Sequence, residues 1–393
     1  MRKSYKFKLF KNKKKARKLN NELWQFYQIY NHSLRLVKKY YKIFGKNPSK
    51  TDLQKHLKRL MDRGLRPEWK KLGYSQGIQQ VTDRIYLSYK AFFDWCKKGK
   101  SKGNSLRKSP PKFRPFRKYK SFTLKQAGWK LDEKSEKILI GKKWYRYNKS
   151  RNIVGTPKTL TVKKDSLGDW FIIISCDLGN DFIPERILST TGKSAGFDFG
   201  LKSFLISSDN EKHDSSEFLK AHLNELKRKS RNHSKKMKGS KNRNKSRKLL
   251  ARLHRKISNK RTDAHFKLSL KLLKQYDYLF FEDLNVKAMQ MLWGRKVSDY
   301  GFAQFLAILE HKAQEHDKHL FKVDRFFPSS KLCSKCGNIK SKDELKLKDR
   351  VYNCGCGLSI DRDFNASVNI LKEGASSFGL DRVIPGFDLV SVA

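Results

Sequence analysis

The amino-acid sequence predicts a multidomain α+β protein, because three patterns follow one another along the chain. Residues near the N-terminus and again between 121 and 190 alternate as strands do, and the block between them has helical periodicity. From Gly192 onward, strands and helices alternate. The 393 residues suffice for two or three domains, each with its own hydrophobic core.

The first strand and a helical block open the chain. Residues 5–9 alternate apolar and charged side chains, which predicts a short strand. Apolar residues then recur at helical spacing through residues 13–96. We interpret these stripes as helix faces packed into a core, and we expect a helical recognition domain over residues 11–96.

A basic segment follows the helices. Residues 97–103 are typical of a flexible linker, and the prolines of residues 110–117 exclude a continuous helix there. The second stretch interleaves cations with aromatic rings, which suits backbone phosphates and stacked bases. A basic turn leading into a sheet is the alternative. The candidate nucleic-acid contacts here are Lys112, Arg114 and Arg117.

Residues 121–190 read as a series of strands separated by turn signals, for example the apolar run 170–174. With the N-terminal strand they would form a small antiparallel sheet or barrel. We therefore expect a wedge-like β-barrel domain made of residues 1–10 and 97–191, into which the helical domain is inserted.

The C-terminal half follows an α/β pattern. Its expected elements are a hairpin over 195–206, a strand over 278–282, a helix over 302–320, a strand over 322–327 and a final helix over 365–371.

The charge of the chain indicates its partner. Lys and Arg number 90 against 37 Asp and Glu, a formal net charge of +53. Such self-repulsion opposes a compact fold unless a polyanion neutralises it, and nucleic acid is the obvious polyanion. The sequence shows no membrane-spanning apolar run and no signal peptide, so we expect a cytoplasmic, nucleoid-associated protein without a membrane partner.

The positive charge is concentrated in residues 211–261, which hold 19 Lys or Arg and 4 Asp or Glu. A solvated, partly disordered tract would explain this excess, but a helix or arm that follows phosphates explains it better. The candidate contacts are Lys227, Arg228, Arg231, Lys235, Arg243 and Arg247.

Three acidic residues occupy unusual positions. Asp198 lies within an apolar strand, where a carboxylate is costly unless it is paired or binds a metal. Glu282 ends an apolar strand, and Asp363 lies where the final helix begins and could cap it. Singly they could be a turn residue, a surface charge and an N-cap. Their order, however, is that of an RNase H-like (RuvC) fold, in which three carboxylates meet at one edge of the sheet.

Clustered carboxylates repel one another and need divalent cations, and Mg²⁺ suits such oxygen ligands. Two ions about 3.5–4 Å apart can activate a water and stabilise the leaving oxygen of a phosphodiester. We expect Asp198, Glu282 and Asp363 to be catalytic Mg²⁺ ligands, with Glu282 also orienting the water. The products would carry 5′-phosphate and 3′-hydroxyl ends.

Four of the six cysteines lie close together, at 333, 336, 354 and 356. Four thiolates suit one structural Zn²⁺, with free thiols as the alternative. The second pair is separated by a single residue, which strains a shared tetrahedron. We expect a zinc-ribbon insertion over 328–357 within a nuclease domain of residues 192–327 and 358–393. The other cysteines are Cys96 and Cys176, and we expect His311, His316 and His319 to be surface residues rather than ligands.

The chain resembles the TnpB (OrfB) proteins of insertion sequences, the ancestors of type V CRISPR effectors. The resemblance covers nearly the whole chain and rests on residues 196–200, residues 281–286, the cysteine window and residues 361–370, in the order and at the spacings of the family. The chain departs from the family pattern in the short Cys354–Cys356 pair and in Ser367, where alanine is usual.

This resemblance implies an RNA-guided DNA endonuclease. A guide RNA from the flank of the element or array would pair with one strand of target double-stranded DNA, and the N-terminal domains would read a short target-adjacent motif. One protein would act per RNA. The alternatives are a CRISPR-associated type V-like effector, an RNA-guided DNA-binding repressor that does not cleave, and a resolvase or RNase H that uses no guide.

Overall fold

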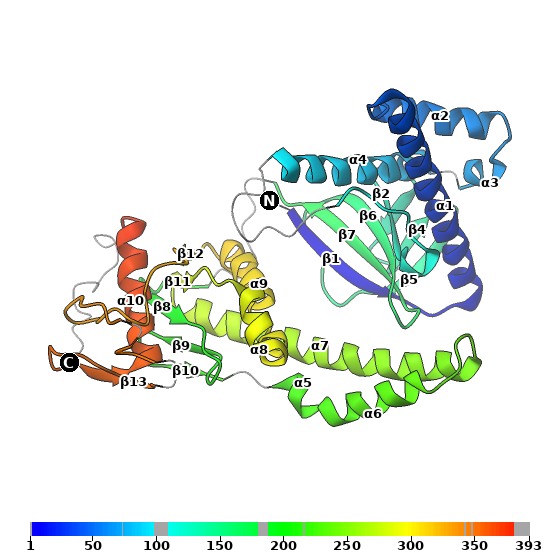
Figure 1. Cartoon of the computed structure of the whole chain (residues 1–393). Helices are drawn as coiled ribbons and strands as arrows, with labels where there is room; N and C mark the ends of the chain where they lie inside the picture. The colour runs from blue at the N-terminus through cyan, green and yellow to red at the C-terminus, as the bar shows by residue number, and fades with distance from the viewer. Residues whose placement is uncertain are drawn as a thin grey trace. The chain divides into compact units, whose positions relative to one another are not determined.

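The protein forms two compact units, Met1–Phe182 and Ile183–Ala393, which are described separately. The computed structural model (Figure 1) describes residues 2–72, 74–97, 109–179, 188–214, 217–341, 343–346 and 349–380. Within these residues no helix is long and apolar enough to cross a membrane.

The first unit is built on an antiparallel sheet of seven strands in the order β2-β6-β7-β1-β5-β4-β3. The N-terminal strand lies inside this sheet and pairs with β7 on one side and β5 on the other. Alternate side chains of β7 are buried, as the strand pattern predicts. The strands are β1 (Arg2–Leu9), β2 (Ser121–Leu124), β3 (Trp129–Asp132), β4 (Lys137–Ile140), β5 (Lys143–Asn148), β6 (Thr156–Lys164) and β7 (Trp170–Asp177).

The sheet is a half-barrel and not the closed barrel that the sequence predicts. Strands β2 and β3 lie at its two edges and do not pair with each other among the described residues. Closure would require these edges to meet, and the edge strands have only four residues each. Helices cover the sheet instead, and Phe26 of α1 stacks on Phe122 of β2 with ring centroids 4.8 Å apart.

The helices of the first unit lie between β1 and β2 in the sequence. The apolar stripes of α1 and α4 are buried in the same hydrophobic core as the sheet, as predicted. The expected linker at 97–103 lies almost entirely outside the described residues, and the proline-rich stretch is extended until a short 3₁₀ helix, Phe116–Lys118. The helices are α1 (Lys13–Phe44), α2 (Lys50–Asp62), α3 (Pro67–Lys70) and α4 (Ser75–Lys97).

The second unit contains a five-stranded sheet in the order β10-β9-β8-β11-β12. The hairpin predicted around Asp198 is confirmed by the antiparallel pair β8 and β9, and β11 runs parallel to both β8 and β12. The strands are β8 (Ser194–Asp198), β9 (Leu205–Ser207), β10 (Lys212–His213), β11 (Tyr278–Glu282) and β12 (His319–Val323).

Helix α10 (Arg362–Ser377) packs very closely on β8. A side chain at Gly196 would overlap the Ser367 carbonyl oxygen, and one at Gly374 would overlap the Phe280 ring of β11. The two glycines therefore set how near the helix comes to the sheet. A small two-stranded sheet, β13 (Val351–Asn353) and β14 (Ser359–Asp361), precedes the helix.

The basic segment 211–261 is largely helical rather than disordered where it is described. Helices α6 and α7 form a hairpin whose contact is the small apolar cluster of Leu226, Leu253 and Ile257. The remaining helices are α5 (Phe218–Ala221), α6 (Leu223–Ser234), α7 (Lys241–Gln275), α8 (Val286–Tyr300) and α9 (Phe302–Glu315).

Several predicted boundaries are wrong. The final helix spans Arg362–Ser377 rather than 365–371, and the strand expected to reach residue 327 ends at Val323. The helix expected to reach residue 320 ends at Glu315, and β12 begins at His319 instead of residue 322. Asp317, with a φ of 54°, reverses the chain between them. A left-handed backbone at an aspartate is uncommon and is not visible as periodicity in a sequence.

We expect Gly196→Ala to lower the free energy of unfolding by about 1–3 kcal/mol, the usual cost of overpacking, because a methyl group there overlaps α10. Chemical denaturation of the purified protein measures this change. Gly355→Ala is the matched control, since no atom lies within 4 Å of its added carbon. Equal losses in the two variants would contradict the account.

Candidate active site and metal centre

The three acidic residues singled out in the sequence line one pocket of about 640 Å³. Asp198 and Glu282 are the last residues of β8 and β11, and the parallel register that pairs Phe197 with Phe281 places the two carboxylates at the next position. Asp363 reaches the pocket from the first turn of α10. Two neighbouring strands and one helix thus supply the three carboxylates.

The apolar surroundings explain why these strand ends hold their positions. The Phe197 and Phe281 rings stack with centroids 4.9 Å apart, and Phe199 stacks on Phe281 at 5.5 Å. Gly200 allows the chain after β8 to turn closely, since an added carbon there would lie 2.7 Å from the Ser203 carbonyl oxygen.

The final helix is capped by Asp361, which excludes the alternative that Asp363 is its cap. Asp361 Oδ1 accepts the N–H groups of Asp363 at 2.9 Å and Phe364 at 3.1 Å. The helix begins at Arg362, two residues earlier than a cap at Asp363 would require. With the N-terminal amides satisfied by Asp361, the Asp363 carboxylate is available to the pocket.

The electrostatics of the pocket favour a cation. Burial raises the pKa of Asp198 to about 8, with further contributions from the negative charges of Asp363 and Glu282. Burial also raises the pKa of Glu282 to about 7, assisted by the charge of Asp283. Ionising these groups together is therefore costly, and a divalent ion with oxygen ligands would remove most of the cost. The donor set fits Mg²⁺.

Cations and aromatic rings complete the lining of the pocket. Arg350 Nη1 lies 3.8 Å from Asp363 Oδ2, and Arg325 pairs with Asp283. Trp293 and Phe326 stand on the same lining and were not identified from the sequence, which offers no periodic signal for them.

The four clustered cysteines converge as predicted. Cys333 and Cys356 Sγ atoms are 3.7 Å apart, those of Cys336 and Cys354 are 3.6 Å apart, and all four lie within 4.8 Å of one another. A zinc–sulfur distance of about 2.3 Å in a tetrahedron gives sulfur separations of about 3.8 Å. The cluster is therefore consistent with a zinc site.

The one-residue gap between Cys354 and Cys356 does not prevent this convergence. Gly357, with a φ of 87°, turns the chain so that its N–H bonds the Cys354 carbonyl at 3.0 Å. Gly337, with a φ of 74°, makes the equivalent turn after the first pair. The Cys356 backbone N–H is the main cause that lowers the pKa of Cys354 to about 7.

The three histidines near this module do not belong to the sulfur group. His319 lies on β12, not on the preceding helix as expected, and its ring stacks on Tyr278 at 5.3 Å. His316 follows the end of α9, and His311 is exposed on that helix.

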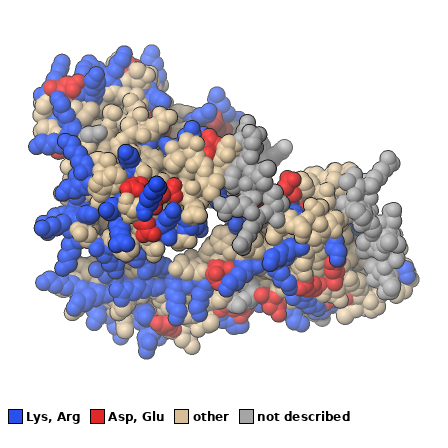
Figure 2. Space-filling view, turned by 180° about the vertical axis from the view of Figure 1, so that it is seen from behind, with Lys and Arg blue, Asp and Glu red and all other residues tan. Residues whose placement is uncertain are grey.

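The basic candidates fall into two groups. Seen from behind, Lys and Arg side chains gather along the lower edge of the molecule, where α6 and α7 lie (Figure 2). The Arg243 guanidinium donates to the Lys236 carbonyl oxygen in the turn of this hairpin. The residues of this group are Lys227, Arg228, Arg231, Lys235, Arg243 and Arg247.

The second group lies in the first unit, beside α1. The Arg114 guanidinium stands over the Tyr30 ring at 5.3 Å, and Asn31 Nδ2 donates to the Arg114 carbonyl oxygen at 2.9 Å. Tyr30 Oη donates to the Lys112 carbonyl oxygen at 3.3 Å, and Arg117 belongs to the short 3₁₀ helix. This basic segment is thus fixed against the helix.

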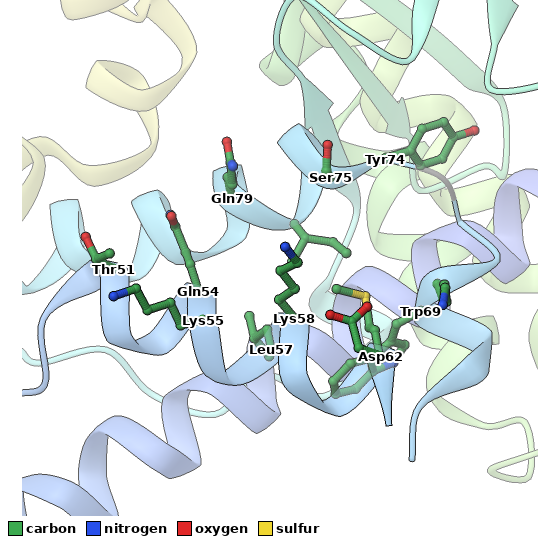
Figure 3. A pocket seen from close by; sticks show the side chains of 13 residues that line it. Thr51, Gln54, Lys55, Leu57, Lys58, Asp62, Trp69, Tyr74, Ser75 and Gln79 are labelled. Atoms are coloured by element: carbon green, nitrogen blue, oxygen red, sulfur yellow. The ribbon is translucent and has the colours of Figure 1, made fainter. Parts of the chain in front are cut away.

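A different pocket, of about 480 Å³, lies among α2, α3 and α4 (Figure 3). Its lining combines apolar side chains, including Leu57 and Trp69, with Lys55, Lys58 and several amides. Among the described residues of its lining, Asp62 is the one carboxylate, so this pocket has no acidic cluster like that of Asp198, Glu282 and Asp363.

Comparisons with known proteins agree with this arrangement. The family description "Probable transposase", of the IS605 OrfB type, matches residues 181–292, and "Cas12f1-like, TNB domain" matches residues 302–370. A Streptomyces pristinaespiralis protein named "Putative RNA-guided DNA endonuclease" is 28% identical over 96% of this chain and 90% of its own. TnpB-like protein L770 of Acanthamoeba polyphaga mimivirus is 28% identical over 65% of this chain and 52% of its own.

A solved structure of a Cas12f1-sgRNA-target DNA complex has a similar fold, with a TM-score of 0.53 and 17% identity over 91% of this chain and 83% of that one. These matches define the class as insertion-sequence proteins with a Cas12f-like mixed α+β fold. Within this class the chain belongs to the TnpB (OrfB) family.

We expect the purified protein to carry about one zinc per chain. Cys336→Ser should lose most of this metal, because three sulfur ligands remain, whereas Cys96→Ser should retain it, since Cys96 lies apart from the cluster. Elemental analysis of both variants measures the difference. Zinc-free wild-type protein, or equal zinc in the two variants, would exclude the site.

The contribution of Asp198 and Glu282 to the stability of Mg²⁺-free protein should fall as the pH rises from about 4 to 8, which the difference between wild type and Asp198→Asn measures. The folded state holds protons on Asp198 and Glu282 up to pKa values of about 8 and 7, whereas the unfolded chain releases them near pH 4. Melting temperatures across this range test the slope. Asp198→Asn should flatten it, and Mg²⁺ should restore stability at pH 8.

The control for this experiment is Asp263→Asn, because Asp263 is an exposed carboxylate of α7 outside the pocket. It should reproduce the wild-type slope. If the stability of wild type relative to Asp198→Asn rose from pH 5 to pH 8, the raised pKa values of Asp198 and Glu282 would be contradicted.

Proposed function

We propose that this protein is an RNA-guided DNA endonuclease that cuts target DNA beside a short target-adjacent motif. The observation that carries the proposal is the pocket in which carboxylates from β8, β11 and α10 converge. Relatives named as RNA-guided DNA endonucleases support the guided activity, and the net charge of +53 supports a large nucleic-acid load.

In this proposal the C-terminal unit supplies the chemistry as a RuvC-like nuclease. Asp198, Glu282 and Asp363 would hold Mg²⁺, and the chemistry that the ion would supply there is activation of a water and stabilisation of the leaving oxygen of the phosphodiester. Glu282 has a pKa of about 7 without metal, which suits a group that orients the water and exchanges a proton near neutral pH. The cysteine module holds Zn²⁺ and stabilises the fold around α10.

The remaining parts bind nucleic acid. The helical block 11–96 and the half-barrel read the target-adjacent motif, and the α6–α7 hairpin follows phosphates of the guide RNA or of the RNA–DNA duplex. Base pairing selects the sequence, so the protein needs only shape, charge and a short motif. We propose one chain per guide RNA, in a cytoplasmic setting where DNA is accessible.

The test is to purify the protein with its co-expressed flanking RNA and to supply a target library with a randomised flanking motif. Cleavage should require the RNA, Mg²⁺ and a motif. Loss of a group that supports a metal ligand lowers activity about 10–100-fold. Asp198→Ala removes a ligand itself, so the cleavage rate should fall by more than this. Asp263→Ala, which changes an exposed carboxylate outside the pocket, should cleave like wild type.

Two results would reject the proposal. Cleavage that persists without RNA would indicate an unguided nuclease, and RNA-dependent DNA binding without cleavage by wild type would indicate a repressor.

A further inference from the structure

Two large aromatic side chains stand exposed on the lining of the acidic pocket, and the proposed chemistry uses neither. Trp293 of α8 is 42% exposed, and Phe326, which follows β12, is 87% exposed. Contact of such large rings with water is unfavourable. Two exposed rings at one polar site therefore indicate a ligand with an apolar face that covers them.

The rings differ from the other aromatics of this unit in their surroundings. Phe199, Phe204 and Phe305 are buried against one another. Among the described residues, by contrast, neither Trp293 nor Phe326 has a stacking partner. Both faces of an unstacked ring remain available to a planar ligand.

The helical spacing of α8 places Trp293 at the pocket. Met289, one turn before Trp293, lines the same pocket, whereas the neighbours Met291 and Leu292 do not, although they are 88% and 73% exposed. Gly294, directly after Trp293, has a φ of 30° and a ψ of −93°, which interrupts the regular helix there.

The turn after β12 holds Phe326 in place. Asp324 Oδ1 accepts the Phe326 N–H at 2.7 Å, and the Asp324 carbonyl oxygen accepts the Phe327 N–H at 3.2 Å. Arg325 forms an ion pair with Asp283, which further restricts the backbone of the turn that carries Phe326. The backbone at Phe326 is therefore held by local hydrogen bonds before any ligand binds.

The charges around the pocket indicate what the ligand carries besides an apolar face. Lys331, Arg350 and Arg362 line the same pocket, and the Arg350 side chain is 57% exposed. Cations, metal-binding carboxylates and unstacked rings together match phosphates alternating with planar bases. Only an unpaired base exposes a face to a side chain, so the occupant is a single strand.

We infer that Trp293 and Phe326 stack on unpaired nucleobases of the DNA strand next to the phosphate that is cut. The identity of the strand rests on the proposed function. The two residues are positioning residues: they hold the strand so that the phosphate lies over the three carboxylates. Stacking accepts any base, which fits an enzyme whose sequence choice is made elsewhere.

The experiment uses the full-length protein and a single-stranded oligonucleotide with 2-aminopurine at one position, with Ca²⁺ in place of Mg²⁺ so that the strand stays uncut. Stacking quenches this fluorophore, so the signal reports the base locally even where other basic surfaces bind the backbone. Wild type should quench the fluorescence. Trp293→Ala and Phe326→Ala should each bind the oligonucleotide about fivefold or more weakly in this assay, which is the smallest affinity loss expected for one base–ring stack.

Trp293→Phe keeps a stacking face and should retain most of the quenching, which a loss of folding could not explain. Met291→Ala is the matched control, since Met291 is more exposed on the same helix but does not line the pocket. Equal quenching in Trp293→Ala, Phe326→Ala and Met291→Ala would overturn the inference.

Cleavage assays separate this inference from the proposed function. Wild type that quenches but never cuts would reject the nuclease and leave the stacking site standing. Guided cleavage by wild type, together with quenching that does not depend on either ring, would reject the stacking site alone.

Discussion

The close packing of α10 on the parallel strands β8 and β11 is the constraint on which the C-terminal unit depends. Gly196 and Gly374 permit it, because any side chain at either position would overlap the backbone or ring opposite. With the helix this near the sheet, its first turn lies beside the end of β8. Asp363 then joins Asp198 and Glu282 at one pocket.

The same helix organises the cysteine module. Asn365 Nδ2 donates to the Leu332 carbonyl oxygen at 2.7 Å, and its Oδ1 accepts the Ser334 N–H at 3.0 Å. Asn369 Nδ2 bonds the carbonyl oxygens of Ser329 and Leu332. These two amides are almost fully buried, and each of these hydrogen bonds offsets the cost of burying it. One helix thus connects the sheet, the acidic pocket and the sulfur cluster.

Much of this arrangement could be predicted from the sequence, because its signals are local. The apolar run before Glu282, the glycines around Asp198 and the spacing of the cysteines each imply a structure without knowledge of distant residues. The order of the acids along an α/β pattern then implied where they meet. Ser367, which departs from the family pattern, is accommodated because its hydroxyl donates to the Phe364 carbonyl oxygen within the helix.

What could not be predicted depends on backbone dihedrals or on pairing between distant segments. The left-handed Asp317 ends α9 early, and the choice of Asp361 rather than Asp363 as the cap depends on one residue's φ and ψ. Whether a sheet closes into a barrel depends on whether β2 and β3 meet, which no periodicity encodes. The interruption of α8 at Gly294 also depends on backbone dihedrals. Trp293, the residue before it, was likewise not identified from the sequence.

The two kinds of surface in this protein suit two different tasks. Binding through Lys and Arg along a helical hairpin is strong but indifferent to sequence, and stacking on exposed rings is also indifferent to sequence. A nuclease built only from such surfaces would cut at random. In the proposed function, selectivity comes from a guide RNA that pairs with bases and also neutralises part of the charge of +53. In that proposal, the charge and the stacking surface of the pocket both follow from assigning sequence recognition to RNA.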